Sequence, residues 1–127
     1  MILVDTDVLI ATLRGADAAR DWLRDARART GRLAVSVVTN AEIIGGTRTP
    51  ERREVTRLLN SLRALPVTDM IAHRAGEFRR HYRRSHTTSG LVDFLIAATA
   101  GVHGLELATL NTKHFPMFDG LTPPFQL

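Results

Sequence analysis

The chain has 127 residues, 44% hydrophobic and 24% charged, which is the size and composition of one globular domain (residues 1–127) with a hydrophobic core. It contains no cysteine, which excludes disulfide bonds, thiolate metal sites and cysteine nucleophiles. No apolar run approaches the ~20 residues that span a bilayer, and no basic segment precedes the first apolar run, so we expect a cytoplasmic protein with no membrane contact.

The net charge is +4, and every basic residue except Lys113 is an arginine. A basic surface favours a polyanion or an acidic protein as partner, and the planar guanidinium group pairs well with phosphate. A GC-rich gene would produce the same preference for arginine, so the preference alone does not decide between these explanations.

Apolar segments of strand and helix type alternate along the chain, which predicts an α/β domain with a mainly parallel sheet of four to five strands flanked by helices. The expected strands are residues 2–4, 33–38, 65–67 and 106–110. The expected helices are residues 7–13, 16–28, 40–44, 50–62, 69–84 and 91–103. The tail from Asp119 to Leu127 is rich in loop formers and could add a short edge strand.

Several local signals refine this pattern. The continuous apolar run Ile2–Val4 is typical of a strand buried on both faces at the centre of a sheet. Thr6 or Asp7 is expected to cap the first helix, and Thr39 or Asn40 the third. Two further expectations concern the packing of apolar side chains. We expect an inward apolar stripe at Ala41, Ile43 and Ile44. We also expect exposed apolar residues around Trp22 and Leu58 that form either a dimer contact or an antitoxin groove.

Three acidic residues stand at positions that the apolar pattern does not explain. Asp5 ends the first strand, Glu42 lies at the start of the third helix, and Asp93 begins the most apolar helix. Strand ends and the starts of following helices meet at one edge of a parallel sheet, so these carboxylates can converge there with Asp7 and Asn111. Uncompensated carboxylates raise one another's pKa, and a divalent cation such as Mg²⁺ or Mn²⁺ resolves the repulsion. Each acid alone is also consistent with a helix cap or a helix-dipole partner.

Four segments resemble, in order, successive motifs of PIN-domain ribonucleases, and more narrowly of VapC-type toxins of bacterial toxin–antitoxin pairs. These segments are residues 2–10, 36–46, 92–100 and 107–115. The resemblance implies a three-layer domain and a Mg²⁺- or Mn²⁺-dependent endoribonuclease that cuts tRNA or rRNA and inhibits translation. It also implies inhibition by a VapB-type antitoxin, a homodimer within a toxin–antitoxin hetero-oligomer, and DNA contact only through the antitoxin.

The resemblance carries over to single positions. Asp5, Glu42 and Asp93 match the acidic metal site. We expect Asp5 and Asp93 to bind the ion directly, and Glu42 to bind it through water or to orient the attacking water. Residues around them match supporting positions of the same site: Thr6, Asp7, Thr39 and Asn111. Asn111 departs from the family, where many members have a fourth acid, which puts a second metal in doubt. Asp119 is a candidate for the missing acid.

Three other functions fit parts of the sequence. Asp5-Thr6-Asp7 also resembles the nucleophile motif of haloacid dehalogenase-like phosphatases, but Leu9 stands where that family has a threonine, and Lys113 is the only lysine. A receiver-like signalling domain would need a phosphoacceptor aspartate in the middle of the sheet, where Val35–Val37 has none. A non-catalytic partner-binding module remains possible.

Other polar residues have weaker signals. Arg48 and the run Arg79–Arg84 are the preferred candidates for contact with RNA phosphates, although each is also typical of a solvated helix face. His114, next to Phe115, is expected to anchor the segment after the last strand by packing, without a catalytic role.

Overall fold

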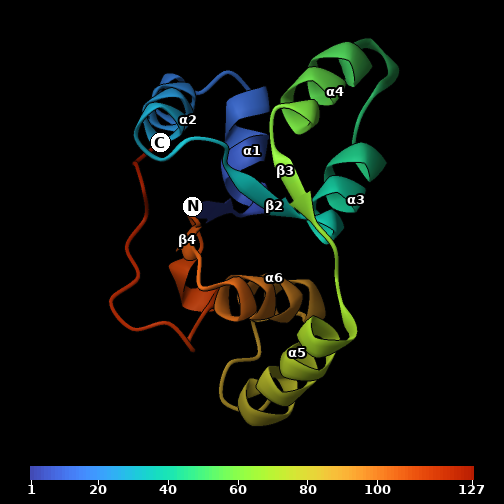
Figure 1. The fold of residues 1–127 in the computed structure, drawn as a ribbon, viewed down its shortest axis with the longest axis vertical. Helices are drawn as coiled ribbons and strands as arrows, with labels where there is room; N and C mark the ends of the chain where they lie inside the picture. The colour runs from blue at the N-terminus through green and yellow to red at the C-terminus, as the bar shows by residue number, and fades with distance from the viewer.

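The computed structural model describes all residues, Met1 to Leu127. Four short strands form one parallel sheet in the order β3-β2-β1-β4 (Figure 1). They are β1 (Ile2–Val4), β2 (Ala34–Ser36), β3 (Arg63–Leu65) and β4 (Glu106–Ala108). In the register of the sheet, Leu3 of β1 pairs with Ala34 on one side and Leu107 on the other. The predicted central place of the first strand is confirmed, and the sheet has four strands.

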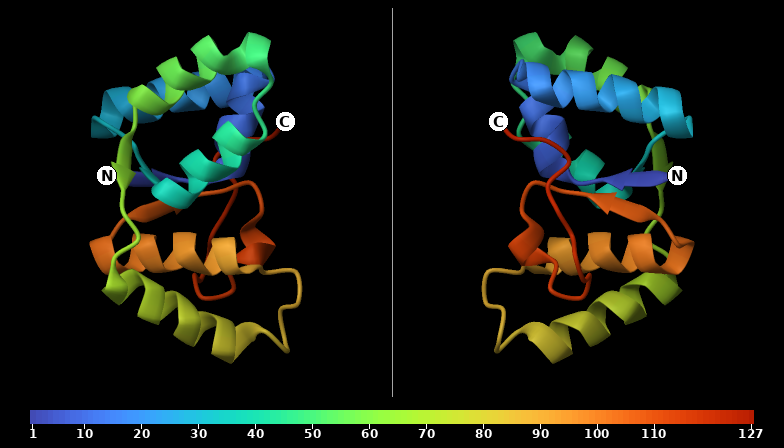
Figure 2. Two further views of the ribbon diagram at one scale, coloured as in Figure 1. Left: turned by 90° about the vertical axis from the view of Figure 1, so that its right-hand side faces the viewer. Right: turned by 90° about the vertical axis from the view of Figure 1, so that its left-hand side faces the viewer.

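Six α-helices flank the sheet: α1 (Thr6–Leu13), α2 (Asp17–Thr30), α3 (Val37–Gly45), α4 (Arg52–Asn60), α5 (Asp69–Tyr82) and α6 (Leu91–His103). Two 3-10 turns, Thr49–Glu51 and Thr112–His114, complete the regular structure. Helices α1 to α4 lie on one side of the sheet, α6 lies on the other, and α5 packs outside α6 (Figures 1 and 2). The three-layer architecture and the order of elements agree with the prediction.

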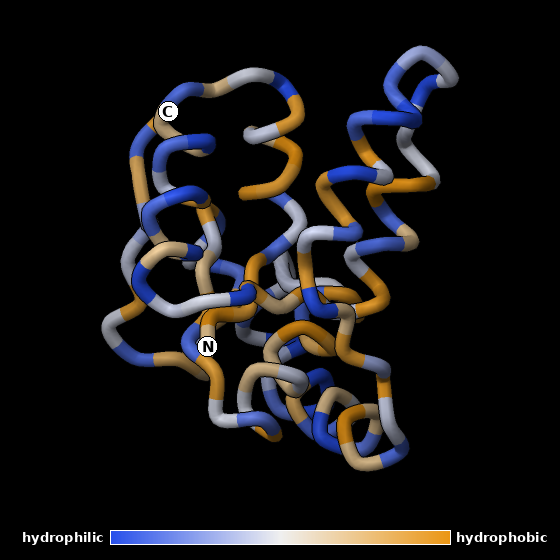
Figure 3. Tube along the Cα trace, turned by 45° about the horizontal axis from the view of Figure 1, so that its top comes forward, coloured by the Kyte–Doolittle hydropathy of each residue, from blue (hydrophilic) through white to orange (hydrophobic).

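Alternation along β1 explains why the sheet is covered on both faces. Ile2 and Val4 join one buried cluster with Val8, Leu23 and other residues of the α1–α4 layer. Leu3 points to the opposite cluster, which α6 supplies mainly through Ile96. In Figure 3 hydrophobic stretches alternate with hydrophilic ones along the chain. Burying both faces fixes β1 rigidly, and with it the residue that follows.

The predicted caps of two helices are wrong by one to four residues. Helix α1 begins at Thr6, and its cap is Asp5, whose Oδ1 accepts a hydrogen bond from Thr6 N at 2.8 Å. Helix α3 begins at Val37, and Ser36 caps it by accepting from Val38 N at 3.2 Å. In both places the chain turns into the helix immediately after the strand ends, so the last strand-like residue becomes the cap.

Packing expectations for the apolar residues of α2, α3 and α4 need correction. Of the stripe predicted on α3, only Ile43 is buried, whereas Ala41 is exposed and Ile44 is 60% exposed. Trp22 and Leu58 are half-buried against the core instead of lining an exposed groove. The ring of Phe125 from the tail packs 6.2 Å from Trp22, centroid to centroid.

The third strand and the tail also differ from the prediction. Strand β3 is Arg63–Leu65 and ends before Pro66, because proline has no N–H to donate to the ladder. Its place at the edge of the sheet agrees with the prediction. The tail forms no strand, and Asp119 lies exposed in a turn.

No helix combines the length and the apolar character that crossing a membrane requires.

Gly104 ends α6 in the left-handed conformation, with φ of 64°. Gly104→Ala is expected to lower the free energy of unfolding by about 1 kcal/mol, because a Cβ disfavours this conformation. Gly101 lies inside the same helix, and no atom lies within 4 Å of the place that an added Cβ would occupy, so Gly101→Ala is expected to stabilise the protein by about 0.5–1 kcal/mol. Urea unfolding of both variants measures the two changes in the free energy of unfolding, which are expected to have opposite signs. Changes of the same sign would contradict the assigned role of Gly104.

Candidate active site

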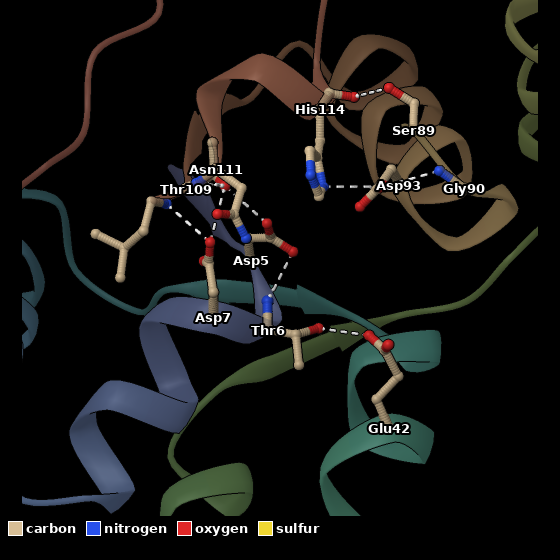
Figure 4. A network of polar contacts seen from close by, with 11 residues as sticks. Asp5, Thr6, Asp7, Glu42, Ser89, Gly90, Asp93, Thr109, Asn111 and His114 are labelled. Carbon is tan, nitrogen blue, oxygen red and sulfur yellow. Dashed lines mark hydrogen bonds and ion pairs between the residues drawn. The ribbon is translucent and has the colours of Figure 1, made fainter. Parts of the chain in front are cut away.

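The predicted site residues lie at the carboxyl edge of the sheet (Figure 4). Asp5 directly follows β1, and Thr109 directly follows β4. Asp93 lies in the first turn of α6, as predicted, whereas Glu42 lies in the second turn of α3, because that helix begins earlier than expected. The structure arranges these side chains in three groups near Asp5 (Figure 4).

The first group joins Asp5 and Asp7 through Thr109. The Thr109 hydroxyl lies 2.7 Å from Asp5 Oδ2 and 3.3 Å from Asp7 Oδ2, and its one hydrogen is better placed to donate to Asp5. Asp7 Oδ2 also accepts from Leu110 N at 3.0 Å, and Thr109 Oγ1 accepts from Asn111 N at 3.0 Å. Asp7 therefore ties α1 to the end of β4; it does not cap α1.

The second group places Glu42 beside the first strand. The hydroxyl of Thr6 lies 2.7 Å from Glu42 Oε1 and 3.1 Å from Thr39 Oγ1. Thr6 and Thr39 are buried, whereas Glu42 is exposed. A buried hydroxyl thus fixes one carboxylate oxygen of a side chain that remains open to solvent.

The third group pairs Asp93 with His114. Asp93 Oδ2 accepts from Gly90 N at 2.9 Å and lies 3.3 Å from His114 Nδ1. The backbone carbonyl of His114 accepts from the Ser89 hydroxyl at 2.8 Å, which ties the 3-10 turn to the start of α6. Both contacts use Oδ2, so Oδ1 of Asp93 makes no hydrogen bond. The prediction that His114 is only a packing anchor misses this contact.

The electrostatics of the site are dominated by uncompensated negative charge. Burial and, after it, the charge of Asp7 raise the pKa of Asp5 to about 7, against an ordinary value of 3.8. The charge of Asp93 adds to this effect, while the hydrogen bonds from Thr109 and Thr6 partly oppose it. Burial also raises the pKa of Asp7. None of the four acids forms an ion pair with an arginine or lysine.

The donor atoms fit a hydrated divalent cation. No three histidine, aspartate or glutamate side chains form a group that could hold a metal ion by themselves. Asp7 Oδ1, however, is buried without a hydrogen-bond partner, and no cationic side chain forms an ion pair with Asp5. Mg²⁺ uses one or two carboxylates and keeps several waters, so a group of neighbouring carboxylates of this kind suits it.

Two predicted residues have weaker ties to the site. Asn111 lies beside Thr109 (Figure 4), and its backbone, not its amide side chain, makes the hydrogen bond found there. Asp119 is exposed and makes no hydrogen bond or ion pair with the acids. Thr109 is a site residue that the sequence did not indicate, because the predicted strand 106–110 included it, whereas β4 ends at Ala108.

A family model described as the PIN domain matches residues 2–120. The chain belongs to the PIN-domain family. It is 66% identical over 125 residues to Ribonuclease VapC10 of Mycobacterium tuberculosis, a match that covers 98% of this chain and 93% of the relative. This places the PIN domain among the VapC ribonucleases, so the predicted resemblance is confirmed.

Solved structures agree with this membership. The PIN domain superposes on a chain of a toxin–antitoxin complex from Klebsiella pneumoniae with a TM-score of 0.82 and 30% identity, over 100% of both chains. It superposes on a chain of DNA-bound VapBC from Salmonella typhimurium with a TM-score of 0.79 and 27% identity, over 96% of this chain and 95% of that one. Ribonucleases with a PIN domain generally depend on a divalent metal ion.

Proposed function

We propose that this PIN domain is the toxin of a VapBC-type toxin–antitoxin pair, an endoribonuclease that uses Mg²⁺ or Mn²⁺ to cleave tRNA or rRNA and thereby stops translation in the cytoplasm. The observation that carries the metal requirement is the buried, unbalanced carboxylate of Asp5 at the carboxyl edge of the sheet. Family membership supports the nuclease and its toxin role, and it disfavours the phosphatase, the receiver domain and the non-catalytic module.

The carboxylate of Asp5 and Oδ1 of Asp93 would hold the cation. No cationic side chain pairs with Asp5, and the His114 contact of Asp93 uses Oδ2 and leaves Oδ1 without a partner. A divalent ion bound there supplies positive charge opposite the charge that develops on the phosphate during cleavage. Glu42 is open to solvent on one side and fixed by Thr6 on the other, so it is placed to orient a water molecule and take its proton. Thr39 keeps the Thr6 hydroxyl in place.

His114 orients Asp93 in this arrangement. Its ring, together with Gly90 N, holds Oδ2 and leaves Oδ1 free for the cation. His114→Ala is therefore expected to weaken Mn²⁺ binding about 10-fold, measured by calorimetry without RNA, with most of the cleavage rate recovered at saturating metal.

His114→Asn is the matched control, because its side-chain amide can still donate to the carboxylate; it is expected to recover most of the metal affinity. Equal Mn²⁺ affinity in the wild type and in His114→Ala would remove His114 from the site. A lowered melting temperature with unchanged metal affinity would assign it a structural role only.

A VapB-type antitoxin is the proposed inhibitor, and contact with DNA would come only through it. A cleft of about 600 Å³ opens between α1, α3 and α4. Its lining combines the apolar side chains of Ile10, Leu13, Ile43 and Val55 with charged ones, Arg14, Glu42, Arg48 and Glu51. An antitoxin segment with an apolar face and one basic side chain could occupy this cleft and set its charge against Glu42. We further propose that the toxin forms a homodimer within the hetero-oligomer.

The experiment that tests the proposed function is cleavage of total cellular RNA by the purified chain. We expect no cleavage in EDTA, cleavage at discrete sites after addition of Mg²⁺ or Mn²⁺, and RNA ends that identify tRNA or rRNA as the substrate when sequenced. Cleavage that persists in EDTA would contradict the metal requirement. Intact RNA at every metal concentration would contradict the nuclease itself.

A further inference from the structure

Arginines are concentrated at one place in this protein. Arg79, Arg80, Arg83 and Arg84 lie at the end of α5 and directly after it. From Phe78 to Val92 the chain contains no acidic residue at all.

These arginines also have no acidic partner within the protein. All four are exposed, and none forms an ion pair. Some other arginines are paired with nearby acids, among them Arg74 in the middle of α5, which lies 3.8 Å from Glu77, whereas no acid lies near the end of the helix. Cations near a helix C-terminus stabilise the helix, but the effect is limited to the last turn and does not account for four unpaired charges.

Aromatic rings lie among these charges. The ring of Tyr82 meets His81 edge-on at 4.5 Å and His86 edge-on at 5.4 Å, centroid to centroid. The His86 backbone donates to the Tyr82 carbonyl at 2.8 Å, which folds the following loop back onto the helix. We call residues 79–84 together with His86 the basic ledge. Cationic side chains interleaved with aromatic rings are typical of surfaces that bind RNA, where phosphates pair with arginine and unstacked bases stack on rings.

The basic ledge leads directly to the active site. The loop that leaves it reaches Ser89, which donates to the carbonyl of His114, and Gly90, which donates to Asp93. In Figure 2 the end of α5 and this loop lie on the side of the molecule toward which the strands run, and this is the side of the acidic site. An RNA strand on the ledge can therefore continue to the carboxylates without crossing the molecule.

We propose that the basic ledge is the surface on which the RNA substrate docks, with the arginines on phosphates flanking the scissile bond and the rings available to unstacked bases. This rests on the proposed endoribonuclease function and adds the place where the RNA binds. The acidic site itself repels phosphates, so a separate cationic surface is needed to hold the polyanion while the cation in the site acts on one phosphate.

The test compares two triple variants that lose the same charge. Arg80, Arg83 and Arg84 are replaced by glutamine in the ledge variant, and Arg52, Arg53 and Arg57 in the control variant. The control arginines are exposed, make no ion pairs, and lie on α4 in the opposite outer layer (Figure 1). The probe is a fluorescent single-stranded RNA of about 20 nucleotides with mixed sequence, bound in EDTA so that no cleavage occurs, at several salt concentrations.

The ledge variant is expected to bind this RNA at least 10-fold more weakly, and its log Kd is expected to depend on log salt with a slope lower by about 2, because three phosphate contacts are lost. The control variant is expected to keep the wild-type slope. Equal effects of the two variants would overturn the proposal, and so would a wild-type slope in the ledge variant. Loss of the co-purified antitoxin with unchanged RNA binding would assign the surface to the protein partner instead. Because binding is measured without metal, the result does not depend on whether the chain cleaves RNA.

Discussion

Asp5→Asn is expected to lower the rate of RNA cleavage by about 10³-fold or more, because the substitution removes a charge that holds the cation opposite the reacting phosphate. Asparagine has nearly the same shape as aspartate, and its carbonyl oxygen can still accept from Thr6 N, the bond that caps α1. The fold is therefore expected to survive. Initial rates of RNA cleavage with Mg²⁺, and calorimetric titration with Mn²⁺, measure the two consequences.

Asp21→Asn is the control for this substitution, since Asp21 is exposed on α2 far from the acidic site. It removes the same charge from the protein and is expected to leave cleavage unchanged. A cleavage rate in Asp5→Asn within 10-fold of the wild type would show that Asp5 does not hold the ion. An unfolded Asp5→Asn would instead make the cap the dominant role of this residue.

In the absence of metal, the wild-type protein is expected to lose up to about 4 kcal/mol of stability between pH 4 and pH 8 through Asp5 alone. Burial and the charge of Asp7 raise the pKa of Asp5 to about 7 in the folded state, against an ordinary value of 3.8. The folded state therefore binds this proton more tightly than the unfolded chain does. The resulting stabilisation is fully present below pH 3.8 and disappears as the pH rises through about 7.

Urea unfolding in EDTA at pH 5 and pH 8, for the wild type and for Asp5→Asn, isolates this contribution. Groups away from Asp5 titrate equally in both proteins, so the difference in free energy of unfolding between the two proteins reports on Asp5 and the acids coupled to it. Asp5→Asn is expected to be more stable than the wild type, and this advantage is expected to be larger at pH 8 than at pH 5. Addition of Mn²⁺ at pH 8 is expected to stabilise the wild type and leave the variant unchanged. A pH-independent difference between the two proteins would contradict the raised pKa.

The fold could be predicted well because its signals are local. The apolar run Ile2–Val4 has no polar face, so it can only lie inside a sheet covered on both sides, and the alternation of strands with helices then requires parallel pairing. The ends of elements were harder. Asp5 and Ser36 have extended backbone conformations at the ends of strands and cap the helices that follow. The residue pattern does not show at which residue the hydrogen bonds between the strands stop.

The sequence by itself determined the strand order along the chain, the family, and the acids that lie at the carboxyl edge. Only the tertiary structure decided which partners those acids have. Thr109 reaches Asp5 across 104 residues of chain, and Thr6 reaches Glu42 across 36, so each contact exists only when β1, β4 and α3 pack together. His114 likewise meets Asp93 because the turn after β4 packs against the start of α6. The physical reason is that periodicity reports which face of an element is buried, whereas a hydrogen bond between distant side chains depends on the final positions of several elements at once.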